Sequence, residues 1–190
     1  EDGIRDDLVT GVQTCALPIL SKIIEPNVGV ITNINYAHAK NFKNIKQIAL
    51  AKSEIINNIK SNGSIVLNAD DKFFKLHEQI SKKKNLKLIS FGIKSKRADI
   101  KLIDIKSFGK NFKIKIRFMN KIKYFIISND YQNNIYNILS ALAVISVNLN
   151  IFNLNKNIFL NFRIPDGRGD HSIIKINNKK INLIDQSYNS

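Results

Sequence analysis

The chain has 190 residues, of which 44% are hydrophobic and 24% charged, a composition that allows a full buried core in an ordinary globular protein. A single cysteine, Cys15, excludes an internal disulfide framework and a zinc site built on cysteines. No apolar run approaches the roughly 20 residues of a membrane-spanning helix, and the first residues lack the basic-then-apolar order of a signal peptide. We therefore expect a cytoplasmic protein without membrane insertion.

The formal net charge of +15 raises the question of a nucleic-acid partner. The lysines are, however, scattered over every segment after residue 20, and Lys, Asn and Ile are all encoded by codons rich in A and T. Genome composition is the simpler explanation, so we expect no nucleic acid to bind. The non-enzymatic alternative is a basic nucleic-acid-binding module, and a steep salt dependence of binding to arbitrary DNA would favour it.

The first nineteen residues, EDGIRDDLVTGVQTCALPI, differ from the rest of the chain. They contain no Lys and no Asn, whereas both are frequent after residue 20. Because they also resemble the conceptual translation of a sequencing adapter, we interpret residues 1–19 as a non-native segment and leave them out of the fold prediction. The alternative is a divergent terminal arm, which an uninterrupted native reading frame in genomic DNA would support.

Strands and helices are predicted to alternate in the first half of the chain. Short β-branched runs indicate strands, and apolar residues at helical spacing indicate helices. In chain order these are a strand at 28–34, a helix at 44–60, a strand at 64–68, a helix at 70–82 that begins with an Asp cap, and a strand at 86–90. Such alternation predicts parallel strands joined by right-handed crossovers.

The period changes in the second half of the chain. Apolar and basic residues alternate without intervening helices, which predicts an antiparallel meander with one solvated face. A long helix follows, and a second domain is expected to begin near 165–169 with a hairpin that turns at Asn177 and Asn178. The predicted elements are strands at 98–106, 111–118 and 122–128, a helix at 133–149, and strands at 172–176 and 180–184.

Lys52 lies inside the apolar stripe of the helix predicted at 44–60. In the structural interpretation, its ammonium group extends to water along the apolar surface. In the functional interpretation, burial lowers the pKa of the amine, which can then add carbon dioxide and offer carbamate oxygens to a metal ion. His38 follows the first predicted strand, at the sheet edge where α/β folds bind ligands. A loop histidine without a role is the alternative for His38.

Six motifs resemble the Mur ligases in order and spacing: TNINYAH at 32–38, IALAKSEI at 48–55, VLNADD at 66–71, NNIYNILSALA at 133–143, GRG at 167–169 and IDQSYNS at 184–190. The similarity covers essentially all of residues 20–190. It implies an α/β fold with a mostly parallel sheet flanked by helices, the P-loop-type central domain of this family, and a small antiparallel β subsheet. Residues 20–164 then correspond to the central ATPase domain, and residues 165–190 to the beginning of the C-terminal ligase domain.

Within the family, AKSEI and the SYN turn point to the members that join D-alanyl-D-alanine to UDP-N-acetylmuramoyl-tripeptide during peptidoglycan synthesis. The resemblance implies that ATP phosphorylates the precursor's carboxylate and that the dipeptide amine attacks the acyl phosphate. It also implies magnesium as a cofactor and a monomeric full-length enzyme. The alternatives within the superfamily are another amino-acid-adding Mur ligase or a folylpolyglutamate synthetase, and the SYN turn argues against both.

The resemblance also implies roles for individual residues. Lys52 matches the carbamylated lysine of the family, and His38 matches the neighbouring magnesium ligand. The residues that match nucleotide contacts are Asn134, Asn137, Arg168, Asp185, Tyr188 and Asn189. A helix-cap or first-turn role is the alternative for the two asparagines, and a charged turn residue is the alternative for the arginine. The chain departs from the family pattern at Asn133, where the family often has histidine. It also departs at Gln186, where the family usually has Asp or Glu, which puts the usual nucleotide contact of that acidic group in doubt.

No G-x-x-x-x-G-K-[ST] sequence occurs in the chain, so the phosphate loop of the family is missing from these 190 residues. We expect that loop before residue 20, and most of the C-terminal domain after residue 190. The chain is thus interpreted as a fragment of the ligase that is inactive by itself.

Overall fold

The computed structural model describes residues 13–36, 42–129, 134–162, 170–177 and 179–185. Its helices are α1 (Gln13–Ile24), α2 (Ile45–Asn58), α3 (Phe74–Lys83), α4 (Ile135–Asn148) and the short 3-10 helix η3 (Ile151–Asn153). Its strands are β1 (Val28–Ile31), β2 (Ser64–Asn68), β3 (Lys87–Gly92), β4 (Ile100–Phe108), β5 (Asn111–Phe118), β6 (Lys121–Ile127), β7 (Asp170–Ile176) and β8 (Lys179–Asp185).

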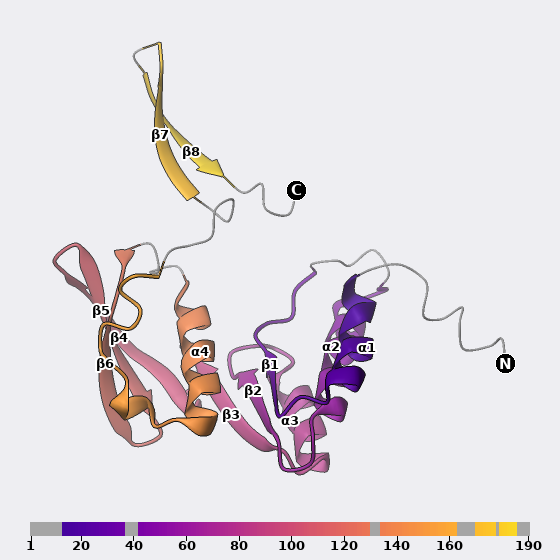
Figure 1. Ribbon diagram of the computed structural model, residues 1–190. Helices are drawn as coiled ribbons and strands as arrows, with labels where there is room; N and C mark the ends of the chain where they lie inside the picture. Colours follow the sequence, from indigo (N-terminus) through magenta and orange to yellow (C-terminus); the bar gives the residue numbers. More distant parts are fainter. Residues whose placement is uncertain (1–12, 37–41, 130–133, 163–169, 178, 186–190) are drawn as a thin grey trace.

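A six-stranded sheet in the order β1-β2-β3-β4-β5-β6 forms the centre of the fold (Figure 1). The first four strands run parallel, and β4, β5 and β6 form an antiparallel meander. Both halves of the prediction from sequence are therefore confirmed. Helices separate β1, β2 and β3, which allows parallel crossovers, whereas β4, β5 and β6 are joined by tight turns. Strands β3 and β4 also pair in parallel, over two residues of each strand, although no helix lies between them.

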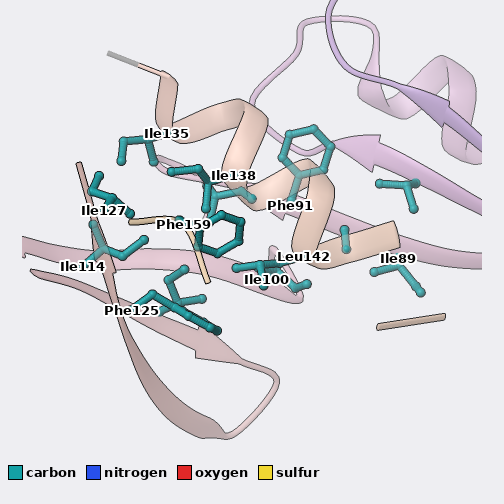
Figure 2. Packing of buried hydrophobic residues seen from close by; sticks show 14 residues of the cluster. Ile89, Phe91, Ile100, Ile114, Phe125, Ile127, Ile135, Ile138, Leu142 and Phe159 are labelled. Atoms are coloured by element: carbon teal, nitrogen blue, oxygen red, sulfur yellow. The ribbon is translucent and has the colours of Figure 1, made fainter. Parts of the chain in front are cut away.

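Helix α4 packs on one face of the sheet, against β1, β2, β3 and β4. Its buried residues Ile138 and Leu142 enter a cluster with side chains from the strands, as Figure 2 shows. Leu139 belongs to the same cluster. The same cluster includes Phe125 and Phe159, whose rings meet edge to face with centroids 5.5 Å apart. This packing fixes the axis of α4 on the sheet.

Helices α2 and α3 pack on the strands with a second apolar cluster. Strand β2 is buried on both sides, because Ile65 and Leu67 belong to this second cluster and Val66 belongs to the cluster under α4. Helix α2 begins at a cap, where the Asn44 side chain accepts a hydrogen bond from the Gln47 N–H at 3.1 Å. Strand β2 therefore has apolar neighbours on both faces, which is typical of a parallel strand that lies between two layers of helices.

One prediction about a helix is wrong, and one helix was not predicted. Asp70 does not cap the helix predicted at 70–82, since α3 begins at Phe74 and its N-cap residue, Phe73, makes no side-chain cap bond. Helix α1 was not predicted, and it starts inside the segment that the sequence led us to leave out. It packs on α2. The interpretation of residues 1–19 as non-native stays a prediction.

Strands β7 and β8 form a separate two-stranded antiparallel sheet. The predicted hairpin is thus confirmed, and Asn177 at its turn has a φ of 49°, a conformation that asparagine tolerates better than most residues. The expected domain boundary at 165–169 lies outside the described residues.

Leu142→Ala should lower the free energy of unfolding by about 2–5 kcal/mol, because it leaves a cavity under α4 where the wild-type side chain is fully buried. Leu149→Ala is the matched control, since Leu149 at the end of the same helix is 62% exposed. Its effect should stay within about 0.5 kcal/mol. Urea unfolding of the two variants measures both values, and equal losses would contradict the assigned packing.

Candidate functional site

The parallel strands β1, β2 and β3 end at the same edge of the sheet, at Ile31, Asn68 and Gly92. Polar residues follow each of these strands in the chain. In an open α/β sheet, ligands bind beyond the carboxyl ends of the strands. This edge is therefore the candidate site.

Lys52 lines a pocket of about 120 Å³ at the end of β1, together with Val30, Ile31, Thr32, Asn33 and Ile55. Its side chain is half-buried, and its Nζ donates a hydrogen bond to the Asn33 carbonyl oxygen at 3.3 Å. The amine thus reaches the polar chain after β1, and Ile55 of the same helix lines the same pocket. Lys52 is at the edge that the sequence indicates, and its chemical role stays a prediction.

The segment after β1 is held by Asp71, which follows β2. Its carboxylate accepts hydrogen bonds from the Ile34 N–H and the Phe73 N–H, both at 2.8 Å. One bond spans 37 residues of sequence and the other spans two. Asp71 therefore joins the ends of β1 and β2, beside the Lys52 pocket wall formed by Thr32 and Asn33.

Asp70 makes a larger set of contacts on the other side of β2. Its carboxylate accepts from the N–H groups of Ile93, Lys94 and Ser95 at 2.6, 2.9 and 2.6 Å, and from the Tyr136 hydroxyl at 2.9 Å. Burial opposes ionisation, but the hydrogen bonds outweigh it and lower the pKa of the carboxyl below its usual value. Burial, and then the bond to Asp70, raise the pKa of Tyr136 to about 12.

Asn134 and Asn137 lie at the start of α4. Asn134 occupies the N-cap position, but its side chain caps no backbone group and instead accepts from the Asn137 amide at 3.3 Å. Asn137 is exposed. The two asparagines thus occupy the cap position and the first turn of α4, as the alternative interpretation expects, although the Asn134 side chain bonds to Asn137 and not to a backbone N–H. A nucleotide contact for the pair stays a prediction.

Other residues implied by the resemblance lie outside the described part of the chain. These are His38, Arg168, Tyr188 and Asn189. Asp185 is the last residue of β8 and pairs with Asp170 across the hairpin, although its side chain is not described. Within the described ranges, no group of three or more His, Cys, Asp or Glu side chains is placed to hold a metal ion. Of the helices described, none is both long and apolar enough to cross a membrane.

His77 is a buried polar residue that the sequence analysis missed. It lies in α3 and is 2% exposed, and its Nε2 is 3.1 Å from the Ala49 carbonyl oxygen of α2. Because a carbonyl only accepts, the ring carries its proton on Nε2. Burial lowers the pKa of His77 below its usual value, and Lys52 acts in the same direction against the opposing Ala49 bond and Asp71 charge. The sequence around His77 alternates polar and apolar residues as the rest of the helix does, so it did not indicate a contact between His77 and Ala49.

Residues 13–145 match the Mur ligase middle domain. The chain belongs to the Mur ligase family. Among curated relatives of this Mur ligase chain, the UDP-N-acetylmuramoyl-tripeptide–D-alanyl-D-alanine ligase of Rickettsia prowazekii is 30% identical over 168 residues, 85% of the chain and 36% of that protein. The UDP-N-acetylmuramate–L-alanine ligase of Borrelia garinii is 35% identical over 91 residues, 47% of the chain and 19% of that protein.

Solved structures show the same fold. MurF of Acinetobacter baumannii superposes with a TM-score of 0.74 at 22% identity, and the match covers 92% of the chain and 36% of that protein. MurF of Thermotoga maritima, in a complex with ADP, superposes with a TM-score of 0.68 at 21% identity, and the match covers 91% of the chain and 38% of that protein. The Mur ligase chain thus spans about a third of these proteins.

His77 should make the stability of the Mur ligase chain depend on pH. Below a pH of about 6.5 the unfolded chain protonates this residue while the folded chain resists protonation, so the free energy of unfolding should fall from pH 7 to pH 5. His77→Gln, whose amide can still donate to Ala49, should flatten this dependence. Thermal unfolding at several pH values measures the slope.

The control for this experiment is Gln79→Ala, a change at an exposed position of the same helix that alters no titratable group. That variant should keep the wild-type slope. The same slope in wild type and His77→Gln would show that burial of His77 has no effect on the pH dependence.

Proposed function

We propose that the protein to which this chain belongs is an ATP-dependent ligase that joins D-alanyl-D-alanine to UDP-N-acetylmuramoyl-tripeptide. Family membership supports the reaction class. The proposed substrates are supported mainly by the similarity to the Rickettsia prowazekii ligase, which extends over 85% of the chain and hence beyond the middle domain. We further propose that the intact ligase acts as a monomer in the cytoplasm and needs no nucleic acid.

The proposed reaction has two bond-forming steps. The terminal carboxylate of the tripeptide attacks the γ-phosphorus of ATP, and ADP leaves. The free amine of D-alanyl-D-alanine then attacks the carbonyl carbon of the acyl phosphate, a C–N bond forms, and the C–O bond to phosphate breaks. The amine loses a proton and inorganic phosphate leaves. In such reactions the protein mainly positions the reactants and stabilises charge.

Lys52 is the residue of this chain that we assign to the metal. Magnesium, when bound, neutralises charge on the transferred phosphoryl group. The pocket at the end of β1 fits an oxygen-liganded cation, because the Asn33 carbonyl lies 3.3 Å from the Lys52 amine and a carbamate on that amine would add anionic oxygens. An unmodified ammonium would repel the cation, so the proposal requires carbamylation. His38 is the second proposed ligand.

Nucleotide binding is assigned to the opposite side of the same edge. The Thermotoga maritima structure contains ADP, which supports a nucleotide site in the fold. We place Asn134 and Asn137 beside the base, since their amides are paired with one another at the start of α4 and leave further donors and acceptors available. Arg168, Asp185, Tyr188 and Asn189 are proposed to approach the nucleotide from the C-terminal domain.

An L-alanine-adding ligase is the second candidate, because the Borrelia garinii relative carries that activity in its name. The two candidates differ in both substrates. Phosphate release by the purified intact ligase should require UDP-N-acetylmuramoyl-tripeptide and D-alanyl-D-alanine. Phosphate release that needs UDP-N-acetylmuramate and L-alanine instead would establish the second candidate.

Lys52→Ala should remove most of the ligase activity, because the metal loses an anionic ligand and the transferred phosphoryl group loses charge stabilisation. Short carboxylic acids such as formate should restore part of the activity by supplying oxygen ligands in the vacated pocket. Lys46→Ala is the control, since Lys46 is an exposed lysine on the same helix. Steady-state turnover with and without formate measures the effect. Normal turnover of Lys52→Ala would contradict the metal-binding role and support the interpretation that the Lys52 ammonium group only extends to water.

A further inference from the structure

We propose that Asp70 is a positioning residue for the nucleotide: its carboxylate joins the first turn of α4 to the loop after β3 and so fixes where Asn134 and Asn137 lie. This inference rests on the proposed function, because it takes these asparagines as contacts to ATP. It assigns Asp70 no contact with substrate and no part in bond making. Its action is through Tyr136.

The four donors of Asp70 come from two separate segments. Ile93, Lys94 and Ser95 supply three consecutive backbone N–H groups from the loop after β3, and Tyr136 supplies a hydroxyl from the first turn of α4. Bonds to an ionised carboxylate are stronger than those between neutral groups. The pattern lowers the pKa of Asp70, so the carboxylate is ionised at neutral pH and all four donors face a negative charge.

The loop after β3 is also held from its carbonyl side. Lys101 Nζ donates to the carbonyl oxygens of Lys94 and Ser95 at 3.2 and 3.1 Å. The Arg117 guanidinium donates to the carbonyl oxygens of Lys96 and Ala98 at 2.8 and 3.2 Å. With its N–H groups on Asp70 and its carbonyls on two cations, the loop has a fixed geometry and can serve as a support for α4.

Gly92 leaves room for the Asp70 carboxylate beside the end of β3. A Cβ at Gly92 would lie 3.0 to 3.1 Å from the Asp70 carboxylate atoms, closer than ordinary contacts. The backbone of Asp70 is itself fixed, because its N–H donates to Asn68 Oδ1 at 2.9 Å and the neighbouring Ala69 N–H donates to the Phe91 carbonyl at 2.7 Å. The carboxylate is thus enclosed between β2 and the end of β3.

Tyr136 transmits this fixed position to the nucleotide edge. It lies in sequence between Asn134 and Asn137, whose side chains bond to each other at 3.3 Å. The buried residues of α4 hold the helix axis on the sheet, but the hydrophobic effect is non-directional and leaves the first turn some freedom of direction. A directional bond from the first turn to a fixed carboxylate removes that freedom.

The test uses the intact ligase with Asp70→Asn and Tyr136→Phe. Both variants should raise the KM for ATP, by roughly tenfold for Asp70→Asn, with kcat and the KM for D-alanyl-D-alanine little changed. The double variant should be no worse than Asp70→Asn, since Tyr136 acts through Asp70. The controls are Asp104→Asn and Tyr124→Phe, which make the same chemical changes in the meander and should keep wild-type values.

Hydrogen exchange of the wild-type and variant chains separates positioning from stability. The amides of Ile93, Lys94 and Ser95 should lose protection in Asp70→Asn. A lower Tm with an unchanged KM for ATP in both variants would overturn the proposal, because Asp70 would then be only structural. If Asp70→Asn fails to fold, Tyr136→Phe decides the question alone, since it removes one hydroxyl and keeps the ring.

The same experiment distinguishes failure of the proposed function from failure of the Asp70 proposal. Wild-type ligase that neither binds ATP nor releases phosphate would contradict that function and the nucleotide role of Asp70 together. Loss of amide protection in Asp70→Asn would still show that the carboxylate holds the loop. Unchanged protection combined with normal ATP turnover in wild type would overturn the Asp70 proposal and leave the proposed function intact.

Discussion

The organisation of the site depends on two carboxylates that directly follow β2. A partly buried carboxylate must find hydrogen-bond donors, and the nearest donors at a sheet edge are backbone N–H groups of the neighbouring loops. Asp71 takes the Ile34 N–H after β1, and Asp70 takes three N–H groups after β3 together with the Tyr136 hydroxyl. Because β2 lies between β1 and β3, these two residues order the loops on both sides of it.

Much of the fold could be predicted because it follows from local periodicity. Alternating strands and helices gave the parallel half, and the two-residue period of 111–118 gave the meander. The VLNADD motif was recognised, but Asp70 was read as a helix cap. A cap is a bond within about three residues, whereas Asp70 bonds to residues 23 to 25 positions away. Sequence alone does not reveal which donors bond to the Asp70 carboxylate, because these contacts depend on the tertiary structure.

The candidate site was predictable only in part for the same reason. Lys52 was singled out because a cation inside an apolar stripe breaks a pattern, and the structure places it on a pocket at the end of β1. His77 breaks no pattern, and its importance follows only from its burial against the Ala49 carbonyl of another helix. Helix α1 was missed because the composition of residues 1–19 led us to leave them out, not because its apolar residues lack helical spacing.

Lys52 and Asp70 show how hydrogen bonding divides roles at one sheet edge. A carboxylate has about four acceptor sites, and Asp70 already accepts from four donors of the chain, three at Oδ2 and one at Oδ1. Within the described residues, the Lys52 amine makes one hydrogen bond and lines an open pocket. A carboxylate with this many donors from the chain mainly holds its surroundings in place, whereas an amine with unused donors beside a pocket can be modified and take a ligand. We therefore propose a chemical role for Lys52 and a positioning role for Asp70.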